Sequence, residues 1–284
     1  MWFIERIMCK QTVQYGTSRQ NTRDDRMSSR SKHDLHGKVS IVTGAAGGIG
    51  EAVSRILAEN GSFVVLNDTR NRKQELGKAI RKIAKQNQQA TEFYADVSRY
   101  QQVSKMVDTI LRRHKRIDIL VNNAGILRRR ESIEEIDDEE WSLVMDTNAK
   151  GVFNCSKAVI KTMKKQNSGK IVNISSSAGR STSELGGAHY TASKAAVLGF
   201  SRHLAREVAS FNINVNAVCP GLVNTQMVRN SISQEELESQ IEAIPMGRLG
   251  TPEEVADLVL FLVSDASSYI NGATIDIGGA SLLI

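Results

Sequence analysis

The sequence is poor in cysteine and proline and has no long apolar run, and each shortage excludes a class of protein. Its 3 cysteines, Cys9, Cys155 and Cys219, are too few and too widely spaced for a disulfide framework or a zinc site. We therefore expect a reducing, cytoplasmic location and no bound metal. No apolar stretch approaches the ~20 residues of a membrane-spanning helix. The apolar start is interrupted by Glu5 and Arg6, which is untypical of a secretory signal.

Charge of one sign is not concentrated along the chain either. The net charge is +6, but the 37 basic residues are scattered and often interleaved with the 31 acidic ones. No basic helix with interleaved aromatic side chains is evident, so neither nucleic acid nor a membrane surface is an expected partner. With 40% hydrophobic and 24% charged residues, the composition is that of a globular domain with a sizeable core.

The chain divides into a polar N-terminal stretch and one long α/β pattern. Residues 1–36 are mostly polar and show no sustained periodicity, so they are predicted to be a disordered extension. Over residues 37–284, short apolar runs alternate with helical patterns, which predicts a single α/β domain, a doubly wound parallel sheet of the Rossmann type with helices on both faces. The predicted strands are Val39–Thr43, Phe63–Leu66, Ala90–Tyr94, Ile119–Val121, Lys170–Ile174, Asn214–Val218 and Ala273–Ile277.

A glycine-rich turn follows the first predicted strand. Gly44, Gly48, Ile49 and Gly50 lie between that strand and a helix predicted over 51–59. Glycine permits a tight turn and a close approach to a pyrophosphate, while the helix N-terminus adds free N–H groups and a positive dipole end. Close helix–sheet packing alone can also select such glycines. The position between strand and helix favours dinucleotide binding.

Acidic residues after the second and third strands extend the predicted cofactor site. Asp68 stands where a carboxylate binds the adenosine ribose hydroxyls and repels a 2′-phosphate. This favours NAD(H), while the nearby Arg70 and Arg72 leave NADP(H) open. Asp96, followed by Val97, is expected either to contact the adenine or to cap the helix that begins near residue 100.

Tyr190 and Lys194 lie four residues apart in a segment with good helix propensity. On a helix these positions share one face, so the ammonium is expected to stabilise the phenolate and lower its pKa. A tyrosine of this kind can exchange a proton near neutral pH. The alternative is a surface helix with one aromatic side chain anchored in the core, and the spacing alone does not separate the two.

Six motifs, in this order, resemble those of the short-chain dehydrogenase/reductase family over residues 38–279. They are Thr43–Gly50, Asn122–Gly125, Asn148, Ile174–Gly179, Tyr190 with Lys194, and Pro220–Thr225. Each is modest alone, whereas their joint order on the expected strand and helix ends is specific. The resemblance implies an enzyme that interconverts a secondary alcohol and a ketone by hydride transfer with NAD(H) or NADP(H).

The resemblance also implies a catalytic tetrad of Asn148, Ser176, Tyr190 and Lys194. In it, Tyr190 exchanges the proton on the substrate oxygen, Lys194 stabilises the phenolate and holds the nicotinamide ribose, and Ser176 hydrogen-bonds the substrate oxygen. Asn148 is expected to hold a water that links Lys194 to solvent. Ser176 fits the Ser-Ser-x-x-Gly pattern, whereas counting thirteen residues back from Tyr190 selects Ser177 instead.

Further contacts are carried over from the same family. Asn123 is expected to brace the sheet beside the cofactor, and the residues after the sixth strand to contact the nicotinamide, namely Pro220, Gly221, Val223 and Thr225. Residues 226–244 are expected to form a mobile lid over the substrate. The helices predicted over 139–166 and 190–209 correspond to a four-helix subunit contact, so a homotetramer is expected.

The substrate is less determined by sequence. Residues 244–254 look most like 3-oxoacyl-(acyl-carrier-protein) reductases, and lysines near 161–165 are candidates to meet an acidic carrier protein. Arg128–Arg130 look like the arginines of gluconate and deoxygluconate dehydrogenases, where they can pair with a carboxylate. Because Asp68 favours NAD(H), the main hypothesis is a dehydrogenase of a secondary alcohol such as a sugar acid or hydroxy acid. The acyl reductase is the alternative, and a catalytically silent nucleotide-binding module is a third.

Overall fold

The computed structural model describes residues 33–86, 88–129 and 132–283. The predicted extension therefore lies outside the described residues up to position 32. Leu35 already belongs to the folded unit, because its side chain is buried and its backbone N–H donates to Asn60 O at 2.8 Å. Leu35, within the stretch expected to be an extension, thus packs with the α/β unit, and the rest of that prediction stays untested.

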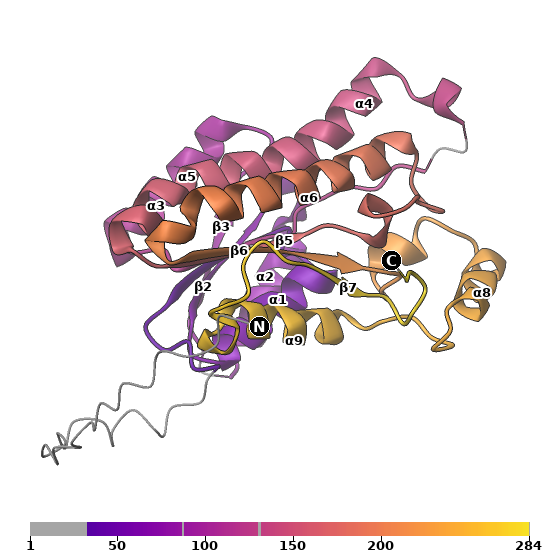
Figure 1. The fold of residues 1–284 in the computed structure, drawn as a ribbon. Coiled ribbons are helices and arrows are strands. Elements are labelled where there is room, and N and C mark those ends of the chain that lie inside the picture. Colours follow the sequence, from indigo (N-terminus) through magenta and orange to yellow (C-terminus); the bar gives the residue numbers. More distant parts are fainter. Residues whose placement is uncertain (1–32, 87, 130–131, 284) are drawn as a thin grey trace, which may run out of the picture. The chain divides into compact units, whose positions relative to one another are not determined.

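A parallel sheet in the order β3-β2-β1-β4-β5-β6-β7 forms the centre of this unit (Figure 1). Nearly continuous apolar runs account for its strands, because both faces are covered. The strands are β1 Val39–Thr43, β2 Phe63–Asp68, β3 Ala90–Tyr94, β4 Ile119–Asn122, β5 Gly169–Ile174, β6 Ile213–Pro220 and β7 Thr274–Ile277. The predicted doubly wound sheet is confirmed, and each predicted strand agrees with the structure to within a few residues.

Two layers of helices cover the sheet (Figure 1). One face carries α1 (Gly48–Glu59), α2 (Lys73–Ala84) and α9 (Pro252–Val263). The other carries α3 (Tyr100–His114), α5 (Gly151–Gln166) and α6 (Ala188–Val208). The short α7 (Gln226–Arg229) and α8 (Gln234–Ala243) lie in the segment between β6 and α9. None of the helices in the described ranges is long and apolar enough to cross a membrane.

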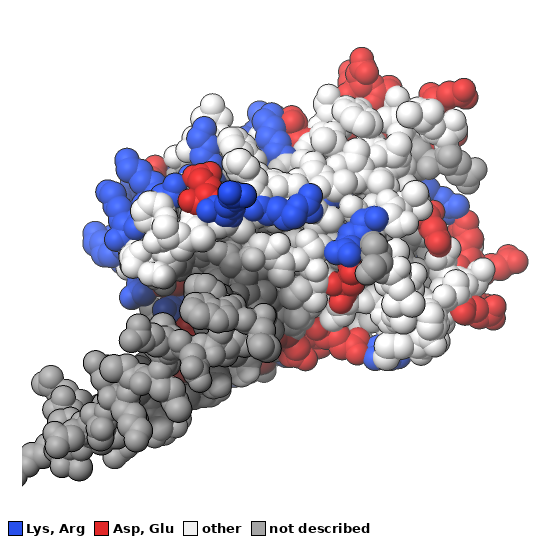
Figure 2. Space-filling model, in the orientation of Figure 1, with Lys and Arg blue, Asp and Glu red and all other residues white. Residues whose placement is uncertain are grey.

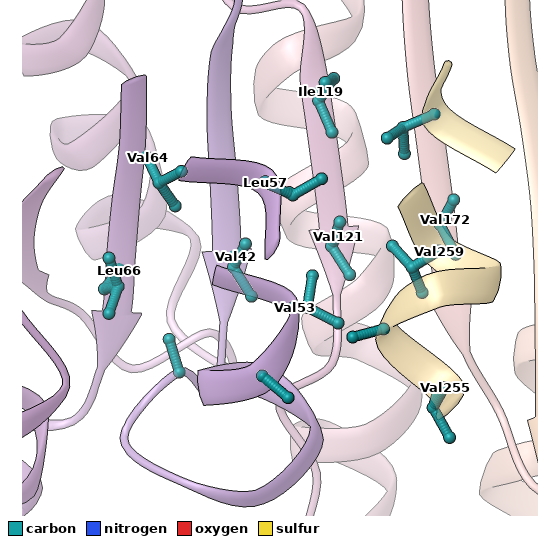
Figure 3. Packing of buried hydrophobic residues seen from close by; sticks show 14 of the residues in the cluster. Val42, Val53, Leu57, Val64, Leu66, Ile119, Val121, Val172, Val255 and Val259 are labelled. Atoms are coloured by element: carbon teal, nitrogen blue, oxygen red, sulfur yellow. The ribbon is translucent and has the colours of Figure 1, made fainter. Parts of the chain in front are cut away.

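The core between α1, α9 and the sheet consists of interdigitating aliphatic side chains (Figure 3). Val53 and Leu57 of α1 and Val259 of α9 pack over Val42 and Val121 of the central strands, and all five are fully buried. Each such side chain contributes about 1.5–3 kcal/mol by leaving water. This packing holds the amino end of α1 against the carboxyl end of β1, where the glycine turn lies.

The helix predicted over 139–166 is interrupted, which corrects the expectation of one continuous helix. The structure has α4 (Asp138–Met145), a π-helical turn over Asp146–Lys150, and then α5. Asn148 lies inside the π turn, with its amide bonded to the backbone of Ile126. A π turn widens a helix by one residue, and such turns frequently occur at functional sites. Hydrophobic periodicity does not detect a one-residue insertion of this kind.

Candidate active site

The glycine turn is too tight to accept a side chain at its closest point. Gly44 and Gly48 have φ of 64° and 55°, the left-handed region that favours glycine. A Cβ on Gly50 would stand 2.2 Å from Gly44 O. No side chain caps the start of α1, whose N-cap residue is Gly47. The first-turn N–H groups are thus available to an anion, which fits the pyrophosphate of a dinucleotide.

Residues directly after β4 hold the turn in place. Asn123 Nδ2 donates to Thr43 O and Gly44 O, both at 3.0 Å. The Thr43 hydroxyl accepts hydrogen bonds from the backbone N–H groups of Asn123 and Ala124, at 3.0 and 3.1 Å. The side-chain amide of Asn123 therefore acts on the turn itself. The family resemblance predicted that Asn123 braces the sheet beside the cofactor, and its contact with a cofactor stays a prediction.

Asp68 lies beside the same turn at the end of β2. One oxygen of its carboxylate accepts the Ala46 N–H at 3.1 Å, and the other accepts the Thr69 N–H at 2.8 Å. The carboxylate is thus fixed at the edge where the predicted dinucleotide's adenosine ribose would lie.

The two arginines after Asp68 occupy different places. The Arg70 guanidinium lies over the Tyr94 ring, 5.3 Å from its centroid. Arg72 reaches back to the turn, where its Nη2 stands 3.7 Å from the position of a Cβ on Gly47. Of the two, Arg72 is therefore the one that borders the glycine turn.

Asp96 and Val97 follow β3, and neither caps a helix. The Asp96 carboxylate accepts from the N–H and hydroxyl of Ser98, at 2.9 and 2.7 Å, which closes a local turn. The N-cap of α3 is Arg99, without a side-chain cap bond, so the capping alternative for Asp96 is wrong. Val97 is buried, and its carbonyl accepts from Asn154 Nδ2 at 2.8 Å.

Ser176 is the serine that the structure brings to Tyr190. Hydrogen bonding from the Ser176 side chain acts to lower the pKa of Tyr190, and the Ser176 Oγ also accepts the Ala178 N–H at 3.1 Å. Ser175 instead donates to Lys194 O at 2.8 Å, and Ser177 begins a 3-10 turn that ends at Gly179. Because consecutive residues at a strand end alternate in direction, only one of the three points at the tyrosine.

Lys194 lies on the same face of α6 as Tyr190, as the spacing predicted. Its Nζ is 5.8 Å from the centre of the Tyr190 ring and donates to Ile174 O at 3.0 Å. Burial lowers the pKa of Lys194 to about 8, and the neighbouring Cys219 acts in the opposite direction. A Cβ on Gly125 would stand 3.4 Å from this Nζ and 3.3 Å from Asn148 Oδ1, so Gly125 separates the two groups.

The expected lowering of the Tyr190 pKa is not what the protein's own side chains produce. Desolvation by burial raises the pKa of Tyr190 and outweighs the hydrogen bond from Ser176. The ammonium of Lys194 lies beside the ring, and its donated bond goes to a backbone carbonyl instead of the phenol oxygen. The spacing therefore predicted the shared helix face correctly and the direction of the pKa shift wrongly.

Asn148 links the tetrad to the loop after β4. Its Oδ1 accepts the Ile126 N–H at 2.8 Å, and its Nδ2 donates to Ile126 O at 2.9 Å and to Ser193 Oγ at 3.0 Å. Ser193 in turn donates to Tyr190 O at 2.7 Å. The four residues predicted as a tetrad therefore lie together at the carboxyl edge of the sheet.

Comparison with known proteins shows the family to which the chain belongs. Residues 44–280 match a family described as "Enoyl-(Acyl carrier protein) reductase". The chain belongs to the short-chain dehydrogenase/reductase family. It is thus an oxidoreductase of CH–OH groups that uses a nicotinamide cofactor.

The chain matches several members of this family, in sequence or in structure, over almost the whole length of each of them. The 3-oxoacyl-[acyl-carrier-protein] reductase of Thermotoga maritima is 39% identical over 249 residues, covering 88% of this chain and 99% of that protein. That of Synechocystis sp. is 40% identical over 250 residues, covering 88% and 98%. A crystal structure of a short-chain type dehydrogenase/reductase from Mycobacterium marinum has a TM-score of 0.83 at 34% identity, covering 89% and 98%.

Of the contacts that the family resemblance predicts after β6, Thr225 lies against the glycine turn, whereas Gly221 and Val223 pack against other segments. Pro220 ends β6, and Gly221 approaches the chain so closely that a Cβ would stand 2.9 Å from Gly278 Cα. Val223 is buried and forms a bridge to Gly250. Thr225 caps α7, and its Cγ2 would stand 3.2 Å from a Cβ on Gly48.

The segment expected to be the lid is tied to the β4 loop by an ion pair that sequence reasoning missed. Arg129 Nη1 and Nη2 donate to the two carboxylate oxygens of Glu236 in α8, at 3.1 and 2.7 Å. Glu236 also closes a capping box with Ser233. These bonds hold the pKa of Glu236 at about 2. In the same loop, the Arg128 carbonyl accepts a hydrogen bond at 3.1 Å from the N–H of Gly187, the residue directly before α6.

Sequence reasoning missed other groups around the tetrad. The hydrophobic periodicity of the sequence does not indicate the π turn. Cys219 was expected to form neither a disulfide nor a metal site, and its position beside Lys194 was not predicted. His189 precedes Tyr190 directly, and its pairing with Glu140 of α4 joins residues 49 positions apart. Adjacency to the predicted tyrosine was the one available signal for His189.

The glycine turn generates a prediction with a matched control. Gly50→Ala is expected to lower the free energy of unfolding by about 2–3 kcal/mol, because the added Cβ forces the backbone of Gly44 to move. Binding of dinucleotide is expected to weaken more than about tenfold. Gly199, also in a helix, has nothing within 4 Å of a Cβ position. Gly199→Ala is expected to raise the free energy of unfolding by about 0.5–1 kcal/mol, because alanine has the higher helix propensity.

Urea unfolding and fluorescence titration with NAD(H) measure both variants. Equal stability of Gly50→Ala and Gly199→Ala would contradict the close contact at the turn.

The buried amine of Lys194 generates a prediction about stability. A lysine whose folded pKa lies below its unfolded value destabilises the folded protein at low pH, and this cost is relieved as pH rises from the folded toward the unfolded pKa. For Lys194 that window runs from about 8 to 10.5. Lys194→Met is expected to abolish turnover and to be about 1–3 kcal/mol more stable near pH 7.

Urea denaturation of the two proteins without cofactor at about pH 7 and about pH 10 measures the difference. The gap is expected to narrow at the higher pH, since the wild-type amine is then uncharged in the folded state. A Lys194→Met protein less stable than wild type at both pH values would contradict the assignment.

Proposed function

We propose that this protein reduces 3-oxoacyl thioesters to 3-hydroxyacyl thioesters with a nicotinamide dinucleotide, by proton transfer from Tyr190. The observation that carries the reaction is the convergence of Tyr190, Ser176 and Lys194 beside the glycine turn. The substrate class is supported by the 3-oxoacyl-[acyl-carrier-protein] reductases that are 39–40% identical over nearly their whole length. This favours the alternative raised from the sequence over a sugar acid.

The proposed chemistry assigns one role to each side chain. The glycine turn and Asp68 would hold the dinucleotide, whose reduced nicotinamide would supply the hydride to the carbonyl carbon. Tyr190 donates its phenolic proton to the carbonyl oxygen, which becomes the new hydroxyl. Ser176 donates a hydrogen bond to that oxygen and so fixes its position. Lys194, adjacent to the ring, stabilises the phenolate that remains.

The state of Lys194 follows from its surroundings. A pKa of about 8 leaves the amine mostly protonated near pH 7, yet close enough to its pKa to exchange a proton. We propose that a water held near Asn148 returns that proton from solvent. Asn148 is suited to this because its amide is immobilised on the backbone of Ile126, one glycine away from the amine.

The pairing of Arg129 bears on the substrate. The sugar-acid hypothesis offered the arginines after β4 to a substrate carboxylate. Arg129, however, already binds the Glu236 carboxylate through two hydrogen bonds. A substrate carboxylate would have to displace this intramolecular partner, whereas a thioester carries no such charge. The ion pair therefore supports the thioester over the sugar acid.

A basic surface lies at the amino edge of the sheet, opposite the edge that carries the tetrad, so it does not itself argue for a carrier protein over coenzyme A. Lysines and arginines gather over the end of the molecule where α3 and α5 terminate (Figure 2). Lys161 and Lys165 of α5 are exposed there, while Lys164 pairs with Glu207 at 2.9 Å. Charge of this kind can raise the rate of encounter with an anionic protein, but it does not place an acyl group at Tyr190.

Asp68 supports NAD(H) as the cofactor. Its carboxylate is held at the edge of the glycine turn, where it would repel a 2′-phosphate. Arg72 is the opposing group, since its guanidinium borders the same turn. We infer that the repulsion from Asp68 outweighs the attraction of Arg72 for a 2′-phosphate. The Asp68 carboxylate is fixed by two backbone N–H groups, whereas Arg72 is paired with Glu75 at 3.4 Å.

We further propose a cytoplasmic homotetramer. Apolar side chains on α4 and α5 are exposed, among them Trp141, Leu143 and Phe153 at 41%, 47% and 45%. Large exposed apolar groups on adjacent helices are typical of subunit contacts. Sedimentation of the protein tests the assembly, and a monomer at micromolar concentration would contradict it.

A substrate panel tests the proposed reaction. Oxidation of NADH and NADPH is followed with 3-oxoacyl thioesters of coenzyme A and of a carrier protein, and oxidation of sugar acids with NAD and NADP. The 3-oxoacyl thioesters are expected to give kcat/KM at least about tenfold above any sugar acid. Tyr190→Phe is expected to lower kcat by about 10²–10⁴-fold without loss of cofactor binding.

If only the sugar acids were turned over, the result would contradict the proposed thioester reductase and support the sugar-acid dehydrogenase. Cofactor binding with no turnover on the whole panel would instead support the silent binding module. Full activity of Tyr190→Phe would refute the acid–base role.

Cofactor choice has its own test. Asp68→Ala is expected to raise kcat/KM for NADPH relative to NADH by about tenfold or more, because a repulsion is removed. Arg72→Ala is expected to lower the residual use of NADPH and leave NADH within about twofold. Initial rates with both cofactors measure the ratios. An unchanged ratio in Asp68→Ala would show that another group selects the cofactor.

A further inference from the structure

A fully buried histidine lies directly before Tyr190 and has no part in the proposed chemistry. The side chain of His189 is 0% exposed, and both of its ring nitrogens have a hydrogen-bond partner. Nδ1 lies 3.0 Å from the backbone nitrogen of Tyr190, and Nε2 lies 3.0 Å from Oε1 of Glu140. The ring therefore bridges the first turn of α6 and the helix α4.

These partners determine which nitrogen carries the proton. A backbone N–H can only donate, so Nδ1 must be an unprotonated acceptor. Nε2 faces a carboxylate oxygen, which can only accept when ionised, so Nε2 must carry the hydrogen. The pair of contacts is thus compatible with one tautomer of the neutral ring, and Glu140 is the group that selects it.

Nδ1 of His189 accepts a hydrogen bond from the backbone N–H of Tyr190, the residue with the proposed reactive hydroxyl. Tyr190 is the third residue of α6, and its N–H also donates to Gly187 O at 2.9 Å. The N–H is thus shared between two acceptors. On the other side, a Cβ on Gly186 would stand 2.8 Å from atoms of Tyr190. The backbone and ring of Tyr190 are therefore confined from two directions.

We propose that His189 is a positioning residue for Tyr190. Held as the Nε2–H tautomer by Glu140, it fixes the start of α6 and so the distance between the Tyr190 and Ser176 hydroxyls. The effect on turnover rests on the proposed acid–base role of Tyr190, but not on the identity of the substrate. A shift of about 1 Å at a reacting group is enough to lower kcat by about a hundredfold.

Nitrogen-15 NMR of the histidine rings tests the tautomer without any activity measurement. The sequence has 5 histidines, and His189→Asn identifies the signal by its loss. At neutral pH the His189 ring is expected to show a proton on Nε2 and a bare Nδ1. Glu140→Gln is expected to move it toward a mixture of tautomers, because an amide can also donate to Nε2. A proton on Nδ1 in the wild-type protein would overturn the proposal.

Two amide variants then separate positioning from packing. In His189→Asn the side-chain oxygen can still accept near the Nδ1 position, whereas in His189→Gln the amide reaches toward Glu140 and leaves no acceptor there. We expect kcat within about threefold of wild type for Asn and about tenfold lower for Gln, with KM within about twofold in both. Equal losses of kcat in both variants would show that His189 acts only through its packing volume and not through the Nδ1 acceptor, and would overturn the proposal.

Circular dichroism and thermal unfolding establish that both variants fold. Should either fail to fold, Glu140→Gln serves instead, because Glu140 is 14% exposed and the change keeps its shape. Its kcat is expected to fall in proportion to the fraction of His189 with a proton on Nδ1, and an unchanged kcat with a changed tautomer would overturn the proposal. If Tyr190→Phe kept full activity while the NMR result held, the proposed function would fail and the tautomer assignment would stand.

Discussion

The reversal of strand order at β1 and β4 is the constraint on which the site depends. All strands are parallel, so their carboxyl ends meet at one edge, and the chain passes from β3 at one side of the sheet to β4 on the other side of β1. The helices after β1 and β4 therefore leave on opposite faces, and the loops between them separate. The glycine turn, Asn123 and the loop that carries Arg129 all lie at this point. Packing of α1 and α9 over the central valines keeps that edge in register.

Polar groups buried at this edge oppose the stability that the aliphatic core supplies. Lys194 is 5% exposed and donates to the backbone carbonyl of Ile174, and burial lowers its pKa to about 8. Asn148 and His189 are also buried, and hydrogen bonds offset the cost of removing them from water. These bonds connect α4, the π turn, α6 and the β4 loop. The arrangement that is costly for folding is therefore also the one that orients Tyr190 and Ser176.

Much of the fold was predictable because local pattern and topology agree. Each strand is an apolar run long enough to cross a covered sheet, and right-handed crossovers leave few ways to order such runs. The glycine turn and the Tyr190 and Lys194 spacing were readable for the same reason, since each depends on neighbours in sequence. Contacts between distant segments were not. The bond between His189 and Glu140, the pair of Arg129 with Glu236, and the π turn at Asn148 each require elements that only packing brings together.

The sequence by itself determined the α/β class, the strand positions and the glycine turn, because these follow from periodicity and glycine placement, and the order of its motifs pointed to Asn148, Tyr190 and Lys194 as candidate catalytic residues. The tertiary structure decided which serine faces Tyr190, which arginine borders the turn, and the direction in which the pKa of Tyr190 is displaced. The physical reason is that a pKa depends on burial and on the orientation of partners. Tyr190 and Lys194 share a helix face in either case, but only the folded protein shows that desolvation outweighs their proximity.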